Sequence, residues 1–281
     1  MMVDTHVHVV ADDRQRYPLQ PTGLTLSWVE AMPVATERLL QSLEEAQVNR
    51  AVLVQAISAY GYDNRYTADS AQRHGDRCTS VCIIDPVAPG AADTLSYWVR
   101  ERGMRGVRLF TATEPEATWL DDEATFPVWQ RAGELGIPVC VQMRAHQISR
   151  LRRVVERFPE VPVALDHLAG PRLEEGAPSP APDLLDLARY PNVHLKFSTV
   201  NLDALARAGA DTKDFFQRLI DRFGVRRLMW GSNYPATYDR SYHEMAELAR
   251  RTFGFLSEEE RGWLLGETAL SLWPELREGR Q

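Results

Sequence analysis

The stretch VDTHVHVV, residues 3–10, places His6 and His8 one residue apart inside an apolar run. Side chains alternate in direction along a β-strand, so both imidazoles are expected to point to the same side, as does Asp4 one step earlier. Continuous apolar runs of this kind are typical of parallel strands that are buried on both faces. The stretch therefore predicts a first strand that presents two imidazoles to one side of a parallel sheet.

Seven further apolar runs follow along the chain, and amphipathic helical patterns separate them. Eight strand–helix repeats in 281 residues predict an α/β protein with a (β/α)8 TIM-barrel fold and a single domain spanning residues 1–281. The alternative is a doubly wound open sheet, but the Gly-rich turn that often follows its first strand is missing from this sequence. The seven runs are AVLVQAI from Ala51, SVCIIDP from Ser80, MRGVRLF from Met104, IPVCVQM from Ile137, VPVALDHLAG from Val161, VHLKFS from Val193 and RLMWGSN from Arg227.

Two connections are unusually long, and both follow the carboxyl end of a predicted strand. Residues 11–36 follow the first strand, and residues 170–183 follow the sixth. Active sites of TIM barrels lie at this face, where long loops form lids or substrate walls. Trp28 in the first loop is a large side chain that would seek a surface to cover, so we expect it to line a substrate pocket.

The overall charge and the cysteines limit the partners of the protein. A formal net charge of −7 argues against nucleic acid, which requires a basic surface, but not against a small anionic substrate. The three cysteines are an odd, sparse set and are expected to be reduced core thiols. No signal-peptide pattern or membrane-spanning apolar window is visible, so we expect a cytoplasmic protein with no membrane partner. The oligomeric state stays open, with a homo-oligomer as one alternative.

Five motifs occur in register with the predicted barrel. DTHVHV, GVRLF, DHLAGP, VHLKFS and WGSNYP, in this order, resemble the amidohydrolase-related family and, within it, the branch of 2-pyrone-4,6-dicarboxylate lactonase and the sugar lactonases. The resemblance covers essentially the whole chain, and GETALSLW from Gly266 is similar to the closing segment of the family. It implies a hydrolase that opens a small cyclic ester, or a related carbonyl compound, that carries a carboxylate.

The resemblance also implies roles for individual residues. His6 and His8 would line the site and bind a metal where one is bound, and His167 would be a further ligand or would polarise the carbonyl group under attack. Asn233 stands where the family usually has an aspartate that takes a proton from the attacking water and passes it on. An amide cannot accept a proton as a carboxylate does, so Asn233 is the departure that bears most on the mechanism.

Three interpretations of Asn233 remain open. Another carboxylate acts as the base, the reaction needs no base at this place, or the site has lost its catalytic activity. The other carboxylates near predicted strand ends are Asp85, Asp166 and Asp239. Asn before Tyr-Pro is also typical of a turn in which the side chain binds nearby backbone.

The donor set for a metal is thin. Gln142 stands on the fifth strand, where metal-dependent relatives often place a histidine or a modified lysine, and an amide is a weak ligand for such a cation. His6, His8 and His167 are therefore tentative ligands for one divalent metal, zinc or manganese, and a metal-independent site is the alternative. Without a metal, each fixed hydrogen-bond donor at the carbonyl oxygen can lower the barrier by about 3–4 kcal/mol.

Other side chains at the predicted strand ends are candidates for substrate binding. Arg108 could hold a substrate carboxylate through two parallel hydrogen bonds, or it could form an ion pair with Asp85. Lys196 could contact substrate or pair with Asp166. The complete set of substrate-binding candidates is Arg108, Gln142, Trp28, Tyr60 and Lys196.

Two functions compete with the lactone hydrolase. The first is a metal-dependent, non-oxidative decarboxylase of an aromatic or unsaturated acid, since the wider superfamily hosts that chemistry. Asn233 counts against it, because such enzymes usually need both the metal and the aspartate on strand eight. The second is a catalytically inactive barrel that binds a small ligand without turnover.

Overall fold

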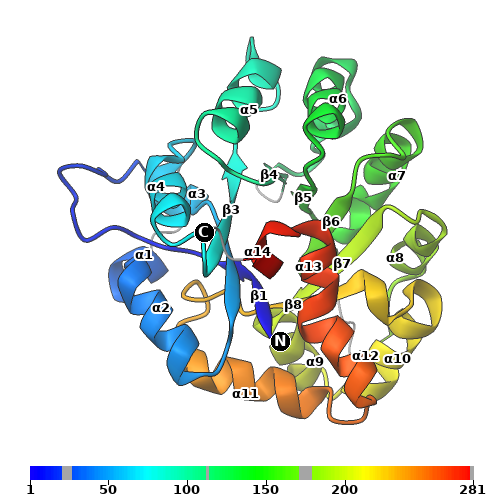
Figure 1. Cartoon of the computed structure of the whole chain (residues 1–281). Helices are drawn as coiled ribbons and strands as arrows, with labels where there is room; N and C mark the ends of the chain where they lie inside the picture. The colour runs from blue at the N-terminus through cyan, green and yellow to red at the C-terminus, as the bar shows by residue number, and fades with distance from the viewer. Residues whose placement is uncertain (21–26, 112–113, 171–178, 279–281) are drawn as a thin grey trace.

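The computed structural model describes residues 1–20, 27–111, 114–170 and 179–278. Eight parallel strands follow one another in chain order, and helices surround them (Figure 1). The predicted (β/α)8 TIM-barrel fold is confirmed. The strands are β1 (Val3–Val7), β2 (Arg50–Val54), β3 (Cys78–Ile83), β4 (Val107–Phe110), β5 (Val139–Gln142), β6 (Val163–Asp166), β7 (Val193–Ser198) and β8 (Leu228–Gly231).

The barrel closes where β1 meets β8. The backbone N–H of Asn233 donates to His6 O at 2.9 Å, and the backbone N–H of His8 donates to Tyr234 O at 2.8 Å. The Thr5 hydroxyl adds a hydrogen bond of 2.7 Å to Trp230 O. The motif that opens the chain is therefore joined directly to the motif that ends the barrel, which sets His6 beside Asn233.

The helices bury one face against the strands. In α7 (Ile148–Arg157), four buried aliphatic residues recur at the spacing of a single helix face. The chain leaves α6 (Phe126–Leu135) at Gly136, whose φ of 63° is left-handed, a conformation that glycine adopts without a steric clash. The other helices around the barrel are α1 (Ser27–Ala31), α2 (Thr36–Glu45), α3 (Ile57–Tyr60), α4 (Arg65–Arg73), α5 (Ala91–Arg100), α8 (Pro182–Asp186), α9 (Thr199–Arg207), α10 (Thr212–Phe223), α11 (Tyr242–Thr252) and α12 (Glu258–Gly262).

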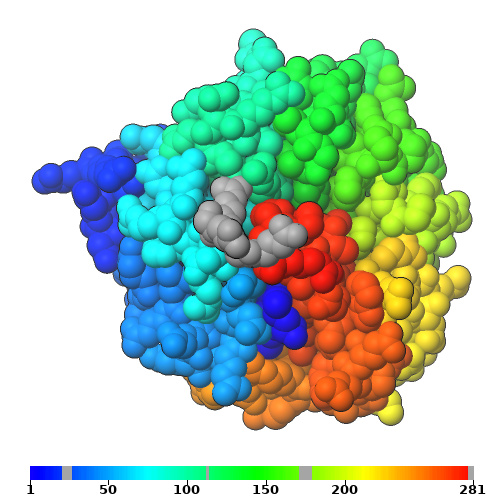
Figure 2. Space-filling model, in the orientation of Figure 1, coloured from blue at the N-terminus to red at the C-terminus, as the bar shows by residue number. Residues whose placement is uncertain are grey.

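Two C-terminal helices close the face at which the strands begin. The indole Nε1 of Trp273, between α13 (Thr268–Leu272) and α14 (Glu275–Glu278), donates to Arg105 O at 2.9 Å, just before β4. Trp273 also belongs to an apolar cluster with side chains from inside the barrel. Figures 1 and 2 show this C-terminal segment next to the N-terminus at the centre of the face. Chemistry is therefore left to the opposite, carboxyl-terminal face.

The long connection after β1 is tied to the neighbouring βα unit. Tyr17 is buried, and its hydroxyl donates to Asp69 on α4. Residues 21–26 of this connection, and residues 171–178 of the connection after β6, lie outside the described residues, so the predicted wall after strand six is described only at its ends. Within the described part of the chain, no helix has the length and apolar character needed to cross a membrane.

Candidate active site

Three imidazoles lie together at the carboxyl-terminal edge of the barrel. His6 is on β1, His8 follows it, and His167 comes directly after β6. The His6 ring lies 5.0 Å from the His8 ring and 4.6 Å from the His167 ring, measured between centroids. The structure thus brings together the three histidines that the sequence singled out, from strands that are far apart in the chain.

A backbone carbonyl holds His8 as one tautomer. Its Nδ1 lies 2.8 Å from Val54 O. Because a carbonyl oxygen only accepts hydrogen bonds, Nδ1 carries the proton and Nε2 keeps its lone pair. Trp28 on α1 is buried, and its ring lies 5.6 Å from the His8 ring between centroids. Burial, and then the charge of Arg108, lowers the pKa of His8 to about 3, so the ring is neutral at physiological pH.

Asp166, the last residue of β6, is fully buried between two cations. The Arg108 Nε donates to Asp166 Oδ2 at 2.8 Å, and Lys196 Nζ lies 3.2 Å from Asp166 Oδ1. His6 Nδ1 lies 3.6 Å from the same Oδ1, which is a contact rather than a hydrogen bond. Two cations against one carboxylate leave one net positive charge beside the imidazoles.

These charges keep Asp166 ionised. Burial by itself raises the pKa of a carboxyl group, but Lys196, His6 and Arg108 together hold the pKa of Asp166 well below its usual range. A carboxylate stabilised in this way is a weak base. Asp166 is therefore a poor substitute for the aspartate that Asn233 replaces.

Arg108 keeps part of its guanidinium group for a ligand. Among the described residues only its Nε makes a hydrogen bond, and its Cζ lies 5.3 Å from the centroid of the Phe110 ring. The two terminal nitrogens remain for a substrate oxygen. This geometry gives Arg108 an ion pair and a possible ligand contact at once, and its partner is Asp166 instead of the Asp85 considered from sequence.

Lys196 faces the interior of the barrel. Its Nζ lies 3.5 Å from Cys140 Sγ and 5.3 Å from the centroid of the Trp273 ring at the closed face. The residue is 1% exposed. Of the two roles expected for Lys196, pairing with Asp166 therefore fits its position, and substrate contact does not.

Gln142 and Tyr60, two other substrate-binding candidates, differ in their surroundings. Gln142 is paired in register with Asp166, so the two side chains share one side of the sheet, and its buried Oε1 has no hydrogen-bond partner among the described residues. An unpaired buried amide oxygen is costly, which makes Gln142 a good contact for a ligand donor.

Tyr60 is buried, and its hydroxyl accepts from the backbone N–H of Ala11 at 2.7 Å. It holds the loop after β1.

Asn233 lies beside His6 through its backbone, but its side chain belongs to a turn. Its φ is 64°, and its Nδ2 donates to Thr237 Oγ1 at 3.2 Å. The turn interpretation therefore describes the side-chain contact that the structure shows. Its backbone N–H binds His6 O, so the Asn233 backbone borders the site.

Asp239 and Asp85, the other two carboxylates considered as the base, are bound by other groups. Asp239 is exposed and forms an ion pair with Arg240 at 2.8 Å. The Asp85 Oδ1 accepts a hydrogen bond from the backbone N–H of Val87 in its own loop. Among the described residues, neither forms a hydrogen bond or an ion pair with an imidazole of the site.

Asp4 forms hydrogen bonds to β8 and α11 and does not face the imidazoles. The prediction that its side chain points to the same side as those of His6 and His8 is therefore wrong. The pairing of β1 with β2 shifts register between Asp4 and Val7. Asp4 accepts hydrogen bonds from the backbone N–H of Ser232 at 2.9 Å and the hydroxyl of Tyr242 at 3.0 Å. Burial raises the pKa of Asp4 to about 6.

Gly231 on β8 makes room for His6. A Cβ atom added at Gly231 would lie 2.6 Å from the Cβ of His6, which is closer than real contacts allow. We expect Gly231→Ala to destabilise the fold by about 1–3 kcal/mol through overpacking and to displace His6. Urea unfolding measures the first effect. The control is Gly262→Ala on α12, where an added Cβ meets nothing within 4 Å; equal stability of the two variants would contradict the proposed contact.

The donor set does not fit a tightly held divalent metal. Among the described residues, no three His, Cys, Asp or Glu side chains are arranged to hold one ion. The nearest carboxylate, Asp166, is already bound by Arg108 and Lys196, and these buried cations oppose a further positive charge. A zinc or manganese ion at His6, His8 and His167 would therefore have at most three neutral nitrogen ligands and no free carboxylate ligand.

Sequence reasoning missed two residues that contact His167. Ser198 Oγ on β7 lies 2.7 Å from His167 Nδ1, and Asn201 Nδ2 on α9 donates to His167 O at 2.9 Å. His167, Leu168 and Ala169 all have positive φ angles, which non-glycine residues adopt only where the surroundings hold them. The signal in the sequence was a capping pattern, a serine at a strand end with a polar residue three positions later.

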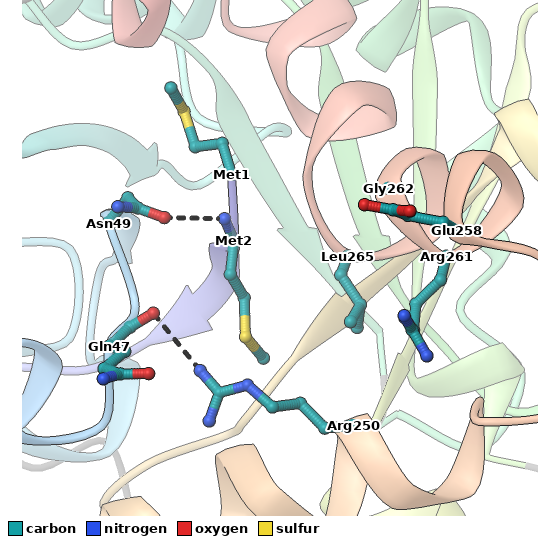
Figure 3. A pocket seen from close by; sticks show the side chains of 9 residues that line it. All are labelled: Met1, Met2, Gln47, Asn49, Arg250, Glu258, Arg261, Gly262 and Leu265. Carbon is teal, nitrogen blue, oxygen red and sulfur yellow. Dashed lines mark hydrogen bonds between the residues drawn. The ribbon is translucent and has the colours of Figure 1, made fainter.

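A cavity of about 560 Å³ lies on the opposite face, near the N-terminus (Figure 3). Arg250 and Arg261 line it, and Arg250 Nη2 binds Ala46 O and Gln47 O. It contains none of the imidazoles. Conserved chemistry in TIM barrels lies at the other end of the strands, so this cavity is not the candidate active site.

The barrel gathers imidazoles from separate strands at its carboxyl-terminal edge, where TIM-barrel enzymes place their active sites. The chain belongs to the amidohydrolase family, whose model matches residues 3–274, and it is a hydrolase of that superfamily. The family predicted from the five motifs is confirmed.

Three relatives illustrate the range of the family. The chain is 27% identical to an L-fucono-1,5-lactonase of Burkholderia ambifaria over 69% of this chain and 68% of that one. It is 24% identical to a 4-sulfomuconolactone hydrolase of Rhizobium radiobacter over 83% of this chain and 75% of that one. The crystal structure of an amidohydrolase from Burkholderia multivorans with bound zinc has the same fold, with a TM-score of 0.75, 23% identity, and coverage of 98% and 99%.

Proposed function

We propose that this protein opens a small lactone that carries a carboxylate, and that it does so without a metal. The observation that carries this proposal is the buried cluster in which Arg108 and Lys196 outnumber Asp166 beside three neutral imidazoles. An excess positive charge in a buried site favours an anionic substrate and the oxyanion that forms during attack. The lactonase names of two relatives support the reaction type.

The site supplies donors for the carbonyl oxygen of such a substrate. His6 has two buried ring nitrogens without a hydrogen-bond partner in the described part of the chain, and Arg108 has its two terminal nitrogens left. Either can stabilise the oxyanion, while Trp28 covers the ring of His8 and excludes water. Gln142 offers a further amide. The three free, buried cysteines support a reducing compartment such as the cytoplasm.

The activity is expected to depend on neutral imidazoles. Burial, opposed by the charge of Asp166, lowers the pKa of His167 to about 4, and the pKa of His8 is about 3. Rings with lowered pKa values stay neutral above those values, so kcat should be level down to about pH 5 and fall only at more acidic pH. A pH profile of kcat tests this. An acidic limb centred near 6.5, the ordinary value for histidine, would contradict it.

The test of the function is a lactone panel run with and without chelator on protein whose metal content has been measured. We expect ring opening that survives chelation, with carboxylate-bearing lactones preferred over neutral sugar lactones. Loss of activity on chelation, together with one bound metal per chain, would overturn the metal-free proposal. Arg108→Leu is expected to remove the preference for a carboxylate while Arg250→Leu, on the opposite face, keeps it.

The same samples decide between the two competing functions. A decarboxylase would release CO2 from an aromatic or unsaturated acid and would stop when its metal is removed. An inactive barrel would bind lactones without turnover, and Asn233→Asp would leave it inactive. Oligomeric state, for which a homo-oligomer is one alternative, is measured separately by light scattering.

A further inference from the structure

Two buried side chains, Ser198 and Asn201, hold His167 in place. Ser198 and Asn201 are each 1% exposed. The Ser198 Oγ lies 2.7 Å from His167 Nδ1, and the Asn201 Nδ2 donates to His167 O at 2.9 Å. The same histidine is therefore held at its backbone and at its ring by two neighbouring residues.

The backbone carbonyl of His167 fixes the orientation of the Asn201 amide. Because a carbonyl oxygen only accepts, Asn201 must present Nδ2 to it, and Oδ1 then faces Ser198. That Oδ1 accepts the backbone N–H of Ser198 at 2.9 Å and the Ser198 hydroxyl at 3.4 Å. When the Ser198 hydroxyl directs its proton to Asn201 Oδ1, it offers a lone pair to His167 Nδ1, and Nδ1 then carries the ring proton.

We propose that Ser198, oriented by Asn201, is a positioning residue that fixes His167 as the Nδ1–H tautomer, so that Nε2 accepts the proton of the attacking water. This rests on the proposed lactone hydrolysis. His167 then supplies the base that the amide of Asn233 cannot be. Asp166 directly precedes His167 in the chain. Its negative charge stabilises the imidazolium that forms, because it raises the pKa of His167 against the lowering caused by burial.

The proton of the attacking water passes through His167 to the leaving ring oxygen. The water oxygen bonds to the lactone carbonyl carbon while one O–H bond breaks and the proton passes to Nε2 of His167. The ring C–O bond of the tetrahedral intermediate then breaks, and its electron pair goes to the ring oxygen. That oxygen takes the proton from Nε2, which releases the open hydroxy acid and restores the neutral imidazole. The Nδ1 proton stays on its bond to Ser198 throughout.

The tautomer can be observed without any substrate. In protein labelled with 15N-histidine, long-range 1H–15N correlation spectra distinguish Nδ1–H from Nε2–H rings, and His167→Gln assigns the signal. We expect the Nδ1–H form in the wild-type protein and a shift toward Nε2–H in Ser198→Ala, because the partner of one ring nitrogen sets the tautomer. An Nε2–H ring in the wild type, or an unchanged tautomer in Ser198→Ala, would overturn the proposal even if lactones are hydrolysed.

Kinetics test the consequence of the tautomer. We expect Ser198→Ala to lower kcat by about 10²-fold with little change in KM, and Ser198→Thr, which keeps a hydroxyl, to restore most of it. Asn201→Ala is a second variant that loosens the hydroxyl while leaving Ser198 in place. The matched control is Ser257→Ala, since Ser257 caps α12 with the same pattern far from the site. If Ser198→Ala and Ser257→Ala leave kcat equally intact, Ser198 acts only as a helix cap.

Discussion

Asp166→Asn is expected to destabilise the protein by about 3–5 kcal/mol, because it leaves two buried cations without their counter-ion. Asn has nearly the same volume as Asp, so the loss reports charge and not packing. Arg108 and Lys196 both lie within 3.2 Å of the carboxylate and are almost completely buried. They cannot move into water without opening the barrel. Urea unfolding followed by circular dichroism measures the change in the free energy of unfolding.

The control for Asp166→Asn is Asp214→Asn, which removes an ion pair of similar length on the surface of α10. Asp214 pairs with Arg218 four residues later, and both side chains are more than half exposed. Such a pair contributes about 0.3–0.5 kcal/mol. If the two variants lose the same small amount of stability, the buried cluster does not hold the site together as described.

His6→Gln is expected to lower kcat for lactone opening by about 10²- to 10³-fold, because it replaces the imidazole nearest to the other two rings by a flexible amide that no longer fixes a donor at the oxyanion. The ring of His6 contacts both His8 and His167, so no neighbouring side chain can take its place. The variant is compared with the wild type under saturating substrate, after its thermal unfolding has shown that it is folded. His243→Gln, an exposed position on α11, is the control and should retain full activity.

A rate for His6→Gln equal to that of the wild type would show that the imidazole cluster does not touch the reacting carbonyl. Loss of stability without loss of rate in the folded fraction would lead to the same conclusion. Both outcomes are separable from a folding defect, because the melting curve and the rate are measured on one sample.

The barrel could be predicted from the sequence because its strands are apolar on both faces and its helices on one. Each apolar run, such as VDTHVHVV or VHLKFS, predicts a buried parallel strand, so eight such runs predict the barrel. His6 and His8 could be predicted as well, since TIM barrels place chemistry at the carboxyl ends of their strands, and the family resemblance implied His167.

Contacts between strands could not be predicted in this way. The register shift in β1 turns Asp4 toward β8, and no periodicity in the sequence predicts this shift. Lys196 could contact substrate or pair with Asp166, and its position in the structure, 3.2 Å from Asp166 and against Trp273, favours the second. Ser198 and Asn201 contact His167 from 31 and 34 residues away, a relation that depends on the closed barrel.

The imidazole cluster is tested as a reaction site by a crystal structure of the protein with the hydroxy acid product of its best lactone bound. We expect the new carboxylate within hydrogen-bond distance of His6, the new hydroxyl group within hydrogen-bond distance of His167 Nε2, and an Arg108 terminal nitrogen on one of the product's oxygens. A product bound elsewhere, or rings of His6, His8 and His167 that face separate cavities, would contradict it.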